Sequence, residues 1–185
     1  MMKVPVLETN NPHLKLIEPD IERDAANGIK WLEGDMGRTT LRLMGVADEH
    51  NKPTTLEAEK ERVNDFLTRQ DQLNWMIEYQ GKVVGSVWVD LEASDFLASP
   101  SVHIMIGDLD MRGKGVGLAS VSTIIEYLKS NGEKTIYSRY VTTNEVSEHL
   151  LSKLGFEPLG EPYNDGDLLF QNVSLDLGTP SEGAS

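Results

Sequence analysis

The chain has 185 residues, 39% of them hydrophobic, and its 30 acidic and 17 basic side chains give a formal net charge of −13. This size and composition predict one globular domain with a single core, and the negative charge disfavours nucleic acid and favours a cationic partner. The absence of cysteine excludes disulfides, thiolate metal sites and a cysteine acyl-enzyme, and no apolar run approaches the ~20 residues that span a bilayer. We therefore expect a soluble, cytoplasmic monomer or homodimer without a membrane partner or a metal site.

The first segment of the chain is predicted to contain one strand and one helix. Residues 14–17 are predicted to form the strand. Asp20 is suited to cap the helix, which Gly34 ends and which has one apolar face formed by Ile21, Ala25, Ile29 and Leu32. Residues 35–52 show no clear period, so we interpret them as a loop or short helix that faces a substrate.

A second helix and a β-hairpin are predicted next. Thr54 and Glu57 are spaced as in a capping box, which indicates the start of a helix. The β-rich runs 74–79 and 83–91 are separated only by residues 80–82, Gln-Gly-Lys, which is typical of a hairpin.

A glycine-rich turn follows the next predicted strand, residues 102–107. The turn is Arg112-Gly113-Lys114-Gly115-Val116-Gly117, and it opens a predicted helix over 115–130. The first amides of a helix have no acceptor within the helix and lie at the positive end of its dipole, and glycines let the backbone approach an anion closely. Because Arg112 and Lys114 add positive charge, the turn is predicted to bind phosphate.

The spacing of this turn excludes two common nucleotide sites. A nucleoside-triphosphate P-loop needs four residues between its first glycine and Gly-Lys, followed by Ser or Thr, and the segment lacks this pattern. A dinucleotide fingerprint needs Gly-x-Gly-x-x-Gly, but the sixth position is Leu118 counted from Gly113 and Ser120 counted from Gly115. The phosphate ligand is therefore of another kind.

The last third of the chain is predicted to add a strand, a helix and a second hairpin. The strand covers residues 135–141 and the helix 145–154. Residues 157–163 and 168–175 are predicted to pair with each other. The small, polar tail over 178–185 is predicted to be disordered.

Together these elements predict an α+β domain over residues 1–177. Because the helix over 115–130 makes a crossover, strands 102–107 and 135–141 should run parallel as neighbours. We expect a three-layer arrangement, in which a mixed, mainly antiparallel sheet of about seven strands has helices on both faces.

The glycine-rich turn resembles the acyl-CoA signature (Arg/Gln)-x-x-Gly-x-(Gly/Ala) of the GNAT superfamily of N-acetyltransferases, matched by Arg112, Gly115 and Gly117. Further on, Asn144 precedes an apolar helix that ends in the sequence Lys-Leu-Gly-Phe at 153–156. Both features are similar to the asparagine and the closing sequence of that family's cofactor region. The likeness is greatest to the branch of ribosomal-protein N-terminal and aminoglycoside acetyltransferases.

The resemblance covers residues 13–177 and implies a GNAT-like fold with acetyl-CoA as co-substrate. In that fold strands 102–107 and 135–141 diverge, and the pantetheine arm of acetyl-CoA bonds to the backbone of the first. The cofactor contacts that the resemblance implies are Met105, Gly107, Arg112, Gly113, Lys114, Gly115, Val116, Gly117 and Asn144.

Acetyl transfer to a primary amine is helped by a general base, because such amines are mostly protonated at neutral pH. Alternation along strand 102–107 places His103 on the same side as the implied contacts with the arm. Since histidine changes protonation near neutral pH, we predict His103 as the base, with a purely structural strand histidine as the alternative. Asp90, at the end of strand 83–91, is the second candidate or an inert surface carboxylate.

The sequence departs from the family at Leu151, where many relatives have a tyrosine that protonates the leaving thiolate. Tyr140 or a water is left for that role. We predict direct acetyl transfer to a cationic small molecule of the aminoglycoside or polyamine type, or to a protein or peptide N-terminus. The alternative is a non-catalytic acyl-CoA-binding sensor or structural module, whereas a toxin acting on charged tRNA fits the acidic surface poorly.

Overall fold

The structure is a computed structural model that describes residues 3–178. Within these residues it has one eight-stranded sheet, with strand order β1-β2-β3-β4-β5-β6-β8-β7, and five α-helices. The strands are β1 (Leu7–Glu8), β2 (Leu14–Ile17), β3 (Gln72–Tyr79), β4 (Lys82–Asp90), β5 (Ser101–Ile106), β6 (Thr135–Val141), β7 (Glu157–Asp165) and β8 (Leu168–Asp176). The helices are α1 (Ile21–Leu32), α2 (Gly34–Leu43), α3 (Leu56–Thr68), α4 (Val116–Ser130) and α5 (Glu145–Lys153), with short 3-10 turns at Asp48–His50 (η1) and Leu109–Met111 (η2).

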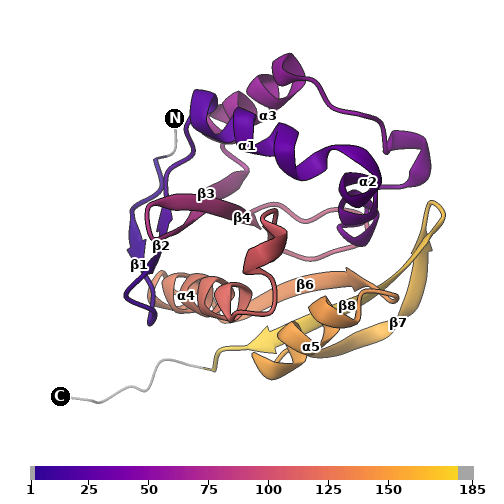
Figure 1. Ribbon diagram of the computed structural model, residues 1–185. Coiled ribbons are helices and arrows are strands. Elements are labelled where there is room, and N and C mark those ends of the chain that lie inside the picture. The colour runs from indigo at the N-terminus through magenta and orange to yellow at the C-terminus, as the bar shows by residue number, and fades with distance from the viewer. Residues whose placement is uncertain (1–2, 179–185) are drawn as a thin grey trace.

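Helices cover both faces of the sheet (Figure 1), with α1, α2 and α3 on one face and α4 and α5 on the other. Two positions at the end of β5, Ile104 and Gly107, lie close to opposite layers. A Cβ on Gly107 would lie 2.1 Å from the ring of Trp31 in α1, whereas a Cβ on Gly117 of α4 would lie 3.9 Å from Ile104 Cδ1. In the part of the chain that the structure describes, β5 and β6 are the one parallel pair. The predicted three-layer, mainly antiparallel fold is confirmed, with eight strands instead of about seven.

The main core lies between the sheet and α4. The predicted apolar face of α4 is buried and consists of Val121, Ile124, Ile125 and Leu128. These side chains pack with apolar residues of the central strands, among them the fully buried Trp75. The rings of Trp75 and Tyr127 of α4 form a T-shaped pair, with 5.3 Å between ring centroids. These contacts hold α4, the helix that follows the glycine-rich turn, against the central strands of the sheet.

Asp20 caps α1 as predicted, since its side chain accepts a hydrogen bond from Arg23 N at 2.9 Å. The segment after α1 is more regular than the predicted loop or short helix, because α2 occupies ten residues of it. A Cβ on Gly37 would come within 2.1 Å of the Leu32 carbonyl. The inner face of α2 therefore relies on small residues instead of an apolar period, and this is why the sequence left a loop and a short helix as alternatives.

The cap of α3 is one residue later than predicted. Thr55, not Thr54, accepts a hydrogen bond from Ala58 N, at 3.2 Å. Thr54 instead donates its hydroxyl to the buried Glu59, at 2.8 Å. The capping-box spacing identified the correct turn of the chain, but two adjacent threonines made its position ambiguous.

Two further predictions concern the ends and the environment of the chain. The tail predicted over 178–185 lies outside the described residues except for Gly178. Among residues 3–178, no helix has the length and apolar character needed to cross a membrane.

Candidate functional site

The glycine-rich turn leaves the N-terminus of α4 open. Gly115 is the N-cap, with φ of 79° and no side-chain cap, and the first intrahelical bond runs from Ala119 N to Gly115 O at 3.1 Å. The three amides of residues 116–118 therefore have no acceptor within the helix. A Cβ on Gly113 or Gly115 would meet no atom within 4 Å, and the first turn of α4 has no acidic residue. The positive end of the helix dipole is thus accessible to an anion.

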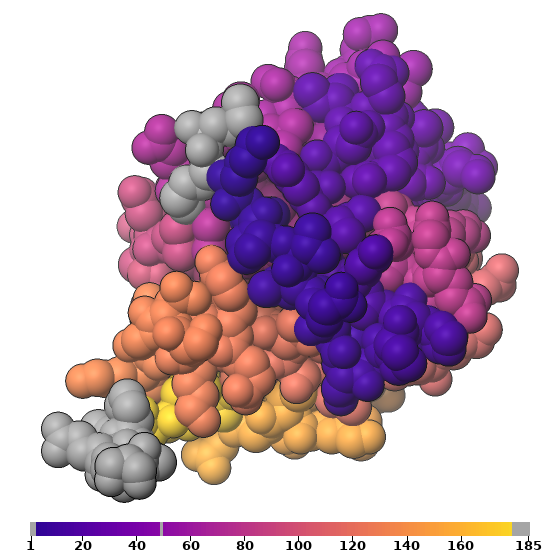
Figure 2. All heavy atoms as spheres, turned by 90° about the vertical axis from the view of Figure 1, so that its left-hand side faces the viewer, coloured from indigo at the N-terminus to yellow at the C-terminus, as the bar shows by residue number. Residues whose placement is uncertain are grey.

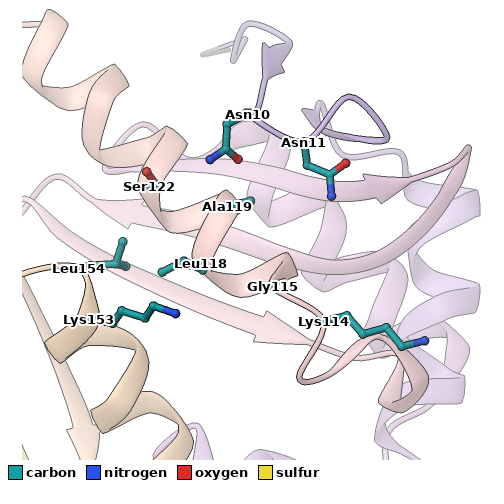
Figure 3. A pocket seen from close by; sticks show the side chains of 9 residues that line it. All are labelled: Asn10, Asn11, Lys114, Gly115, Leu118, Ala119, Ser122, Lys153 and Leu154. Atoms are coloured by element: carbon teal, nitrogen blue, oxygen red, sulfur yellow. The ribbon is translucent and has the colours of Figure 1, made fainter.

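An open cavity of about 390 Å³ lies beside the first two turns of α4 (Figure 3). It is lined by Asn10, Asn11, Lys114, Gly115, Leu118, Ala119, Ser122, Lys153 and Leu154. Lys153 reaches from α5 toward α4, and the two asparagines come from the N-terminal segment, whose atoms Figure 2 shows against the α4 region. Of these residues the sequence predicted Lys114 and Gly115. Lys153 was part of the closing sequence without a role, and nothing marked Asn10 or Asn11.

Arg112 is directed away from the open amides. Its Nε donates to Ile106 O at 2.9 Å, and its Nη2 donates to Thr40 Oγ1 of α2 at 3.1 Å. Loss of hydration lowers the pKa of Arg112 from its usual value, although a guanidinium keeps its charge throughout the range in which proteins fold. The Arg112 side chain therefore joins the end of β5 to α2, and its predicted contact with phosphate stays a prediction.

Asn144 has a similar connecting role. Its Oδ1 accepts from Ser147 N at 3.1 Å and caps α5, while its Nδ2 donates to Leu43 O at the end of α2, also at 3.1 Å. The predicted position of Asn144 near the arm or thiol of a cofactor is not tested by these bonds. They show that Asn144 connects the start of α5 to the end of α2, which lies on the opposite face of the sheet.

Strands β5 and β6 diverge as the resemblance implied. They share one registered pair within residues 3–178, Ser101 with Tyr137. Next to it, Tyr137 N donates to Pro100 O at 2.9 Å and Ser138 Oγ donates to Val102 O at 2.7 Å. Beyond Val102 the two strands separate, which leaves a gap in the middle of the sheet at the end from which the chain enters the phosphate turn.

The backbone groups of β5 alternate between its two neighbours. Gly107 N donates to Val84 O of β4 at 2.9 Å, so Met105 and Gly107 direct their backbone groups toward β4. Ile104 and Ile106 direct theirs toward the gap. The backbone groups of β5 that face the gap are thus those of Ile104 and Ile106, and the predicted cofactor contacts of Met105 and Gly107 stay a prediction.

The sheet face toward α1 and α3 has a row of polar and aromatic side chains on three adjacent strands. Registered partners share a face, which places on this side Gln72, Asn74, Ser86, Trp88, Asp90, Ser101 and His103. Gln72, Asn74, Ser86 and Ser101 are buried. Buried polar side chains are costly unless they are used in hydrogen bonds or in function, so this row marks the second part of the site.

The two predicted base candidates are in contact. His103 Nε2 lies 3.1 Å from Asp90 Oδ2 and 2.9 Å from Ser101 Oγ. The imidazole stacks on Trp88, with 5.5 Å between ring centroids and 21° between planes. Burial acts to raise the pKa of Asp90, but hydrogen bonds from His103 and Gln72 outweigh it and leave this pKa below its usual value. Asp90 is therefore a carboxylate anion at neutral pH.

On the α5 side of the site, Leu151 occupies the position where many relatives have the tyrosine that protonates the thiolate. The Leu151 side chain is buried in the core. Tyr140 of β6 lies near Glu148 of α5. Burial, and then the Glu148 carboxylate, raise the pKa of the Tyr140 phenol, so it remains a protonated donor at neutral pH.

Comparison with known proteins agrees with this geometry. Residues 18–157 match the family described as "Acetyltransferase (GNAT) domain". The chain belongs to this GNAT family. It is 29% identical over 96 residues to the uncharacterized N-acetyltransferase MJ1207 of Methanocaldococcus jannaschii, a match that covers 50% of this chain and 42% of that protein.

Solved GNAT structures superpose on most of the chain. RimL, a ribosomal L7/L12 α-N-protein acetyltransferase in complex with coenzyme A, has a TM-score of 0.77 at 14% identity and covers 93% of this chain and 98% of its own. The microcin C7 self-immunity acetyltransferase MccE, in complex with acetyl-CoA and AMP, has a TM-score of 0.72 at 14% identity and covers 90% and 94%. At such identities these structures establish a common fold. The chain spans only 20% and 42% of the lengths of the curated relatives that it matches.

Proposed function

We propose that the chain is an acetyl-CoA-dependent N-acetyltransferase that acts on a primary amine. The proposal rests on one juxtaposition, the open N-terminus of α4 next to the gap between β5 and β6. Coenzyme A contains a diphosphate, which suits unpaired helix amides, and an extended arm with amide groups, which suits an unpaired strand edge. Each feature alone fits many ligands, but the two together fit this one.

The residues present fit the parts of acetyl-CoA in order along the chain. The backbone of Gly113 to Gly117 is proposed to hold the diphosphate, and the Ile104 backbone and the Ile106 N–H to bond the arm, since Ile106 O already accepts from Arg112. The cavity beside α4 is proposed to take the nucleoside end of coenzyme A. Lys114 and Lys153 line this cavity and are proposed to contact the phosphate on the ribose. Asp108, which lies four residues before this turn, is paired with Lys82 at 2.7 Å, which lowers its pKa and offsets its charge.

The proposed general base, His103, lies on the face of the sheet opposite α4. Acetyl-CoA supplies an acetyl thioester, and the Ile104 N–H is the proposed donor to its carbonyl oxygen. His103 takes a proton from the amine, whose nitrogen bonds to the carbonyl carbon while the carbon–sulfur bond breaks. The sulfur leaves as a thiolate and takes a proton from Tyr140 or water. An alkyl thiol ionises near pH ~8.5, so this departure needs little assistance.

For the acceptor we propose a cationic small molecule, such as an aminoglycoside or polyamine, because the net charge of −13 attracts cations. A protein or peptide N-terminus is the second candidate. It is favoured by the similarity to RimL, which acts on the N-terminus of a ribosomal protein. The competing class is an acyl-CoA-binding sensor without turnover.

The test has a binding part and a turnover part. Calorimetry should detect binding of coenzyme A, and the double variant Lys114→Ala/Lys153→Ala should bind about tenfold more weakly because two charge-assisted contacts are lost. Lys129→Ala, an exposed lysine at the other end of α4, is the matched control and should bind as the wild type does. No detectable binding of coenzyme A would overturn the proposal.

Turnover is followed as release of the free thiol from acetyl-CoA with a panel of polyamines, aminoglycosides and N-terminal peptides. Release above the amine-free background with at least one class is expected, and the class that responds identifies the acceptor. Tight binding of coenzyme A without thiol release by any amine would favour the sensor.

A further inference from the structure

Three adjacent strands bring one polar chain of contacts to His103. The first residue of β3, Gln72, is registered with the last residue of β4, Asp90, which in turn is registered with the first residue of β5, Ser101. His103 lies two residues further along β5, on the same face of the sheet. The contact is thus fixed by strand pairing and not by loops, which suits it to hold a side chain in one orientation.

The atoms in contact decide which imidazole nitrogen carries the proton. His103 Nε2 faces both Asp90 Oδ2, at 3.1 Å, and Ser101 Oγ, at 2.9 Å. The serine hydroxyl can donate or accept, so it permits either tautomer. A carboxylate only accepts, so a lone pair on Nε2 would face the lone pairs of Asp90. Asp90 therefore requires the proton on Nε2 and leaves the lone pair of the neutral ring on Nδ1.

Gln72 in turn holds the carboxylate. Its Nε2 donates a short hydrogen bond to Asp90 Oδ1, which leaves Oδ2 for the histidine. The Gln72 side chain is buried, and its Oε1 has no hydrogen-bond partner. The opposite amide orientation would place that oxygen against the carboxylate, so the observed orientation favours the bond to Asp90 at the cost of an unpaired buried acceptor.

The charged groups around this chain of contacts favour the anionic form of Asp90. Arg69, in the connection before β3, is the nearby cation, and it is itself held by two bonds to Asp71, at 2.7 and 2.9 Å. Besides Asp90, β4 places the neutral ring of Trp88 against the imidazole. Asp90 is thus the acidic group in contact with His103.

We infer that Gln72 and Asp90 are positioning residues that fix the Nε2–H tautomer of His103, so that Nδ1 is the nitrogen that accepts the proton of the acceptor amine. This inference rests on the proposed function for the role of His103, but the tautomer itself is a property of the protein alone. Asp90 then acts through His103 instead of being a second, independent base.

The experiment measures the tautomer directly by long-range 1H–15N correlation spectra of the uniformly labelled full chain above neutral pH. The chain has four histidines, and the His103 signals are assigned by their absence in His103→Gln. The expected wild-type result is a protonated Nε2 and an unprotonated Nδ1. A wild-type His103 with its proton on Nδ1 would overturn the inference.

Variants then test whether Asp90 and Gln72 are the cause. Asp90→Asn should give a mixture of tautomers, and Gln72→Leu should give a smaller shift in the same direction. Asp71→Asn, which removes a nearby carboxylate that does not contact His103, should keep the wild-type spectrum. An unchanged tautomer in Asp90→Asn would contradict the inference. If Asp90→Asn fails to fold, the wild-type spectrum still decides it.

Kinetics separate positioning from binding. With an amine that is acetylated, Asp90→Asn should lower kcat at least tenfold while leaving the KM for acetyl-CoA nearly unchanged. Asp90→Glu should restore part of the loss, and an equal change in both parameters would contradict a positioning role. If no amine is acetylated, the proposed function fails, whereas the spectra still test the tautomer.

Discussion

The two faces of β5 differ in chemistry although they belong to the same six residues. Val102 and Ile104 face α4 and join the main core, where their neighbours on β4 are Val87 and Val89. Ser101 and His103 face the opposite layer, where their neighbours are Asp90 and Trp88. The period of two in a strand thus separates a face that stabilises the fold from a face that is equipped for proton transfer.

Substitutions on the apolar face should therefore change stability, and substitutions on the polar face should change rate. The apolar face is close-packed by α4, so loss of volume there costs unfolding free energy. The polar face has fewer buried apolar groups, and its side chains are held by hydrogen bonds. If substitutions on either face changed stability and rate to the same extent, this division would be contradicted.

The largest expected effect is on the apolar face. Ile124→Ala should lower the free energy of unfolding by about 2–5 kcal/mol, because Ile124 is completely buried and the substitution leaves a cavity. Urea denaturation measures this. Val146→Ala, an apolar residue of α5 that is 79% exposed, is the matched control and should change stability by less than about 0.5 kcal/mol. A similar loss in both variants would contradict the assignment of the core.

The second effect is on the polar face. His103→Gln should lower the rate of acetylation about 100-fold, because a general base is lost, while the affinity for coenzyme A remains nearly unchanged. Steady-state kinetics and calorimetry measure the two quantities. His149→Gln makes the same substitution at an exposed position of α5 and should retain full activity. Unchanged turnover in His103→Gln would remove this residue from the mechanism.

The third effect is at Asn144, which links α5 on one face of the sheet to α2 on the other. Asn144→Ala should lower the free energy of unfolding by about 1 kcal/mol, because the cap of α5 is lost. Asn144→Asp keeps an acceptor for Ser147 N but cannot donate to Leu43 O. It should therefore retain the cap and lose only the link to α2, so thermal unfolding should place it between the wild type and Asn144→Ala.

The smallest effect is a pH dependence. The pKa of Asp90 is lower in the folded chain than its usual value, so its contribution to stability is present above that usual value and is lost as the pH falls through the lower, folded pKa. The wild type should therefore lose stability more steeply than Asp90→Asn below about pH 4, and the difference between them should be constant above about pH 5. Parallel urea curves across this range would show that Asp90 gains nothing from its contacts.

Local order was predictable where neighbouring residues decide it. Asp20 as a cap, the hairpin at Gln80-Gly81, and the buried face of α4 follow from side-chain spacing and glycine conformation, which act over a few residues. The glycine-rich turn was predicted for the same reason. For α2 the sequence left a loop or a short helix open, because its contact face is built from Gly37 and Thr40 and becomes apparent only when α1 packs against it.

The amino-acid sequence by itself determined the layered fold, the family and the turn suited to a phosphate, since periodicity, glycine and charge are written in consecutive residues. Only the tertiary structure decided which backbone groups of β5 face the gap, that Arg112 and Asn144 are bonded to α2, and that Asp90 meets His103. The bonds of Arg112 and Asn144 depend on how α2 packs against the rest of the fold, whereas strand register fixes the β5 backbone groups and the contact of Asp90 with His103. A shift of one residue would turn each side chain to the other face, and no local pattern specifies that register.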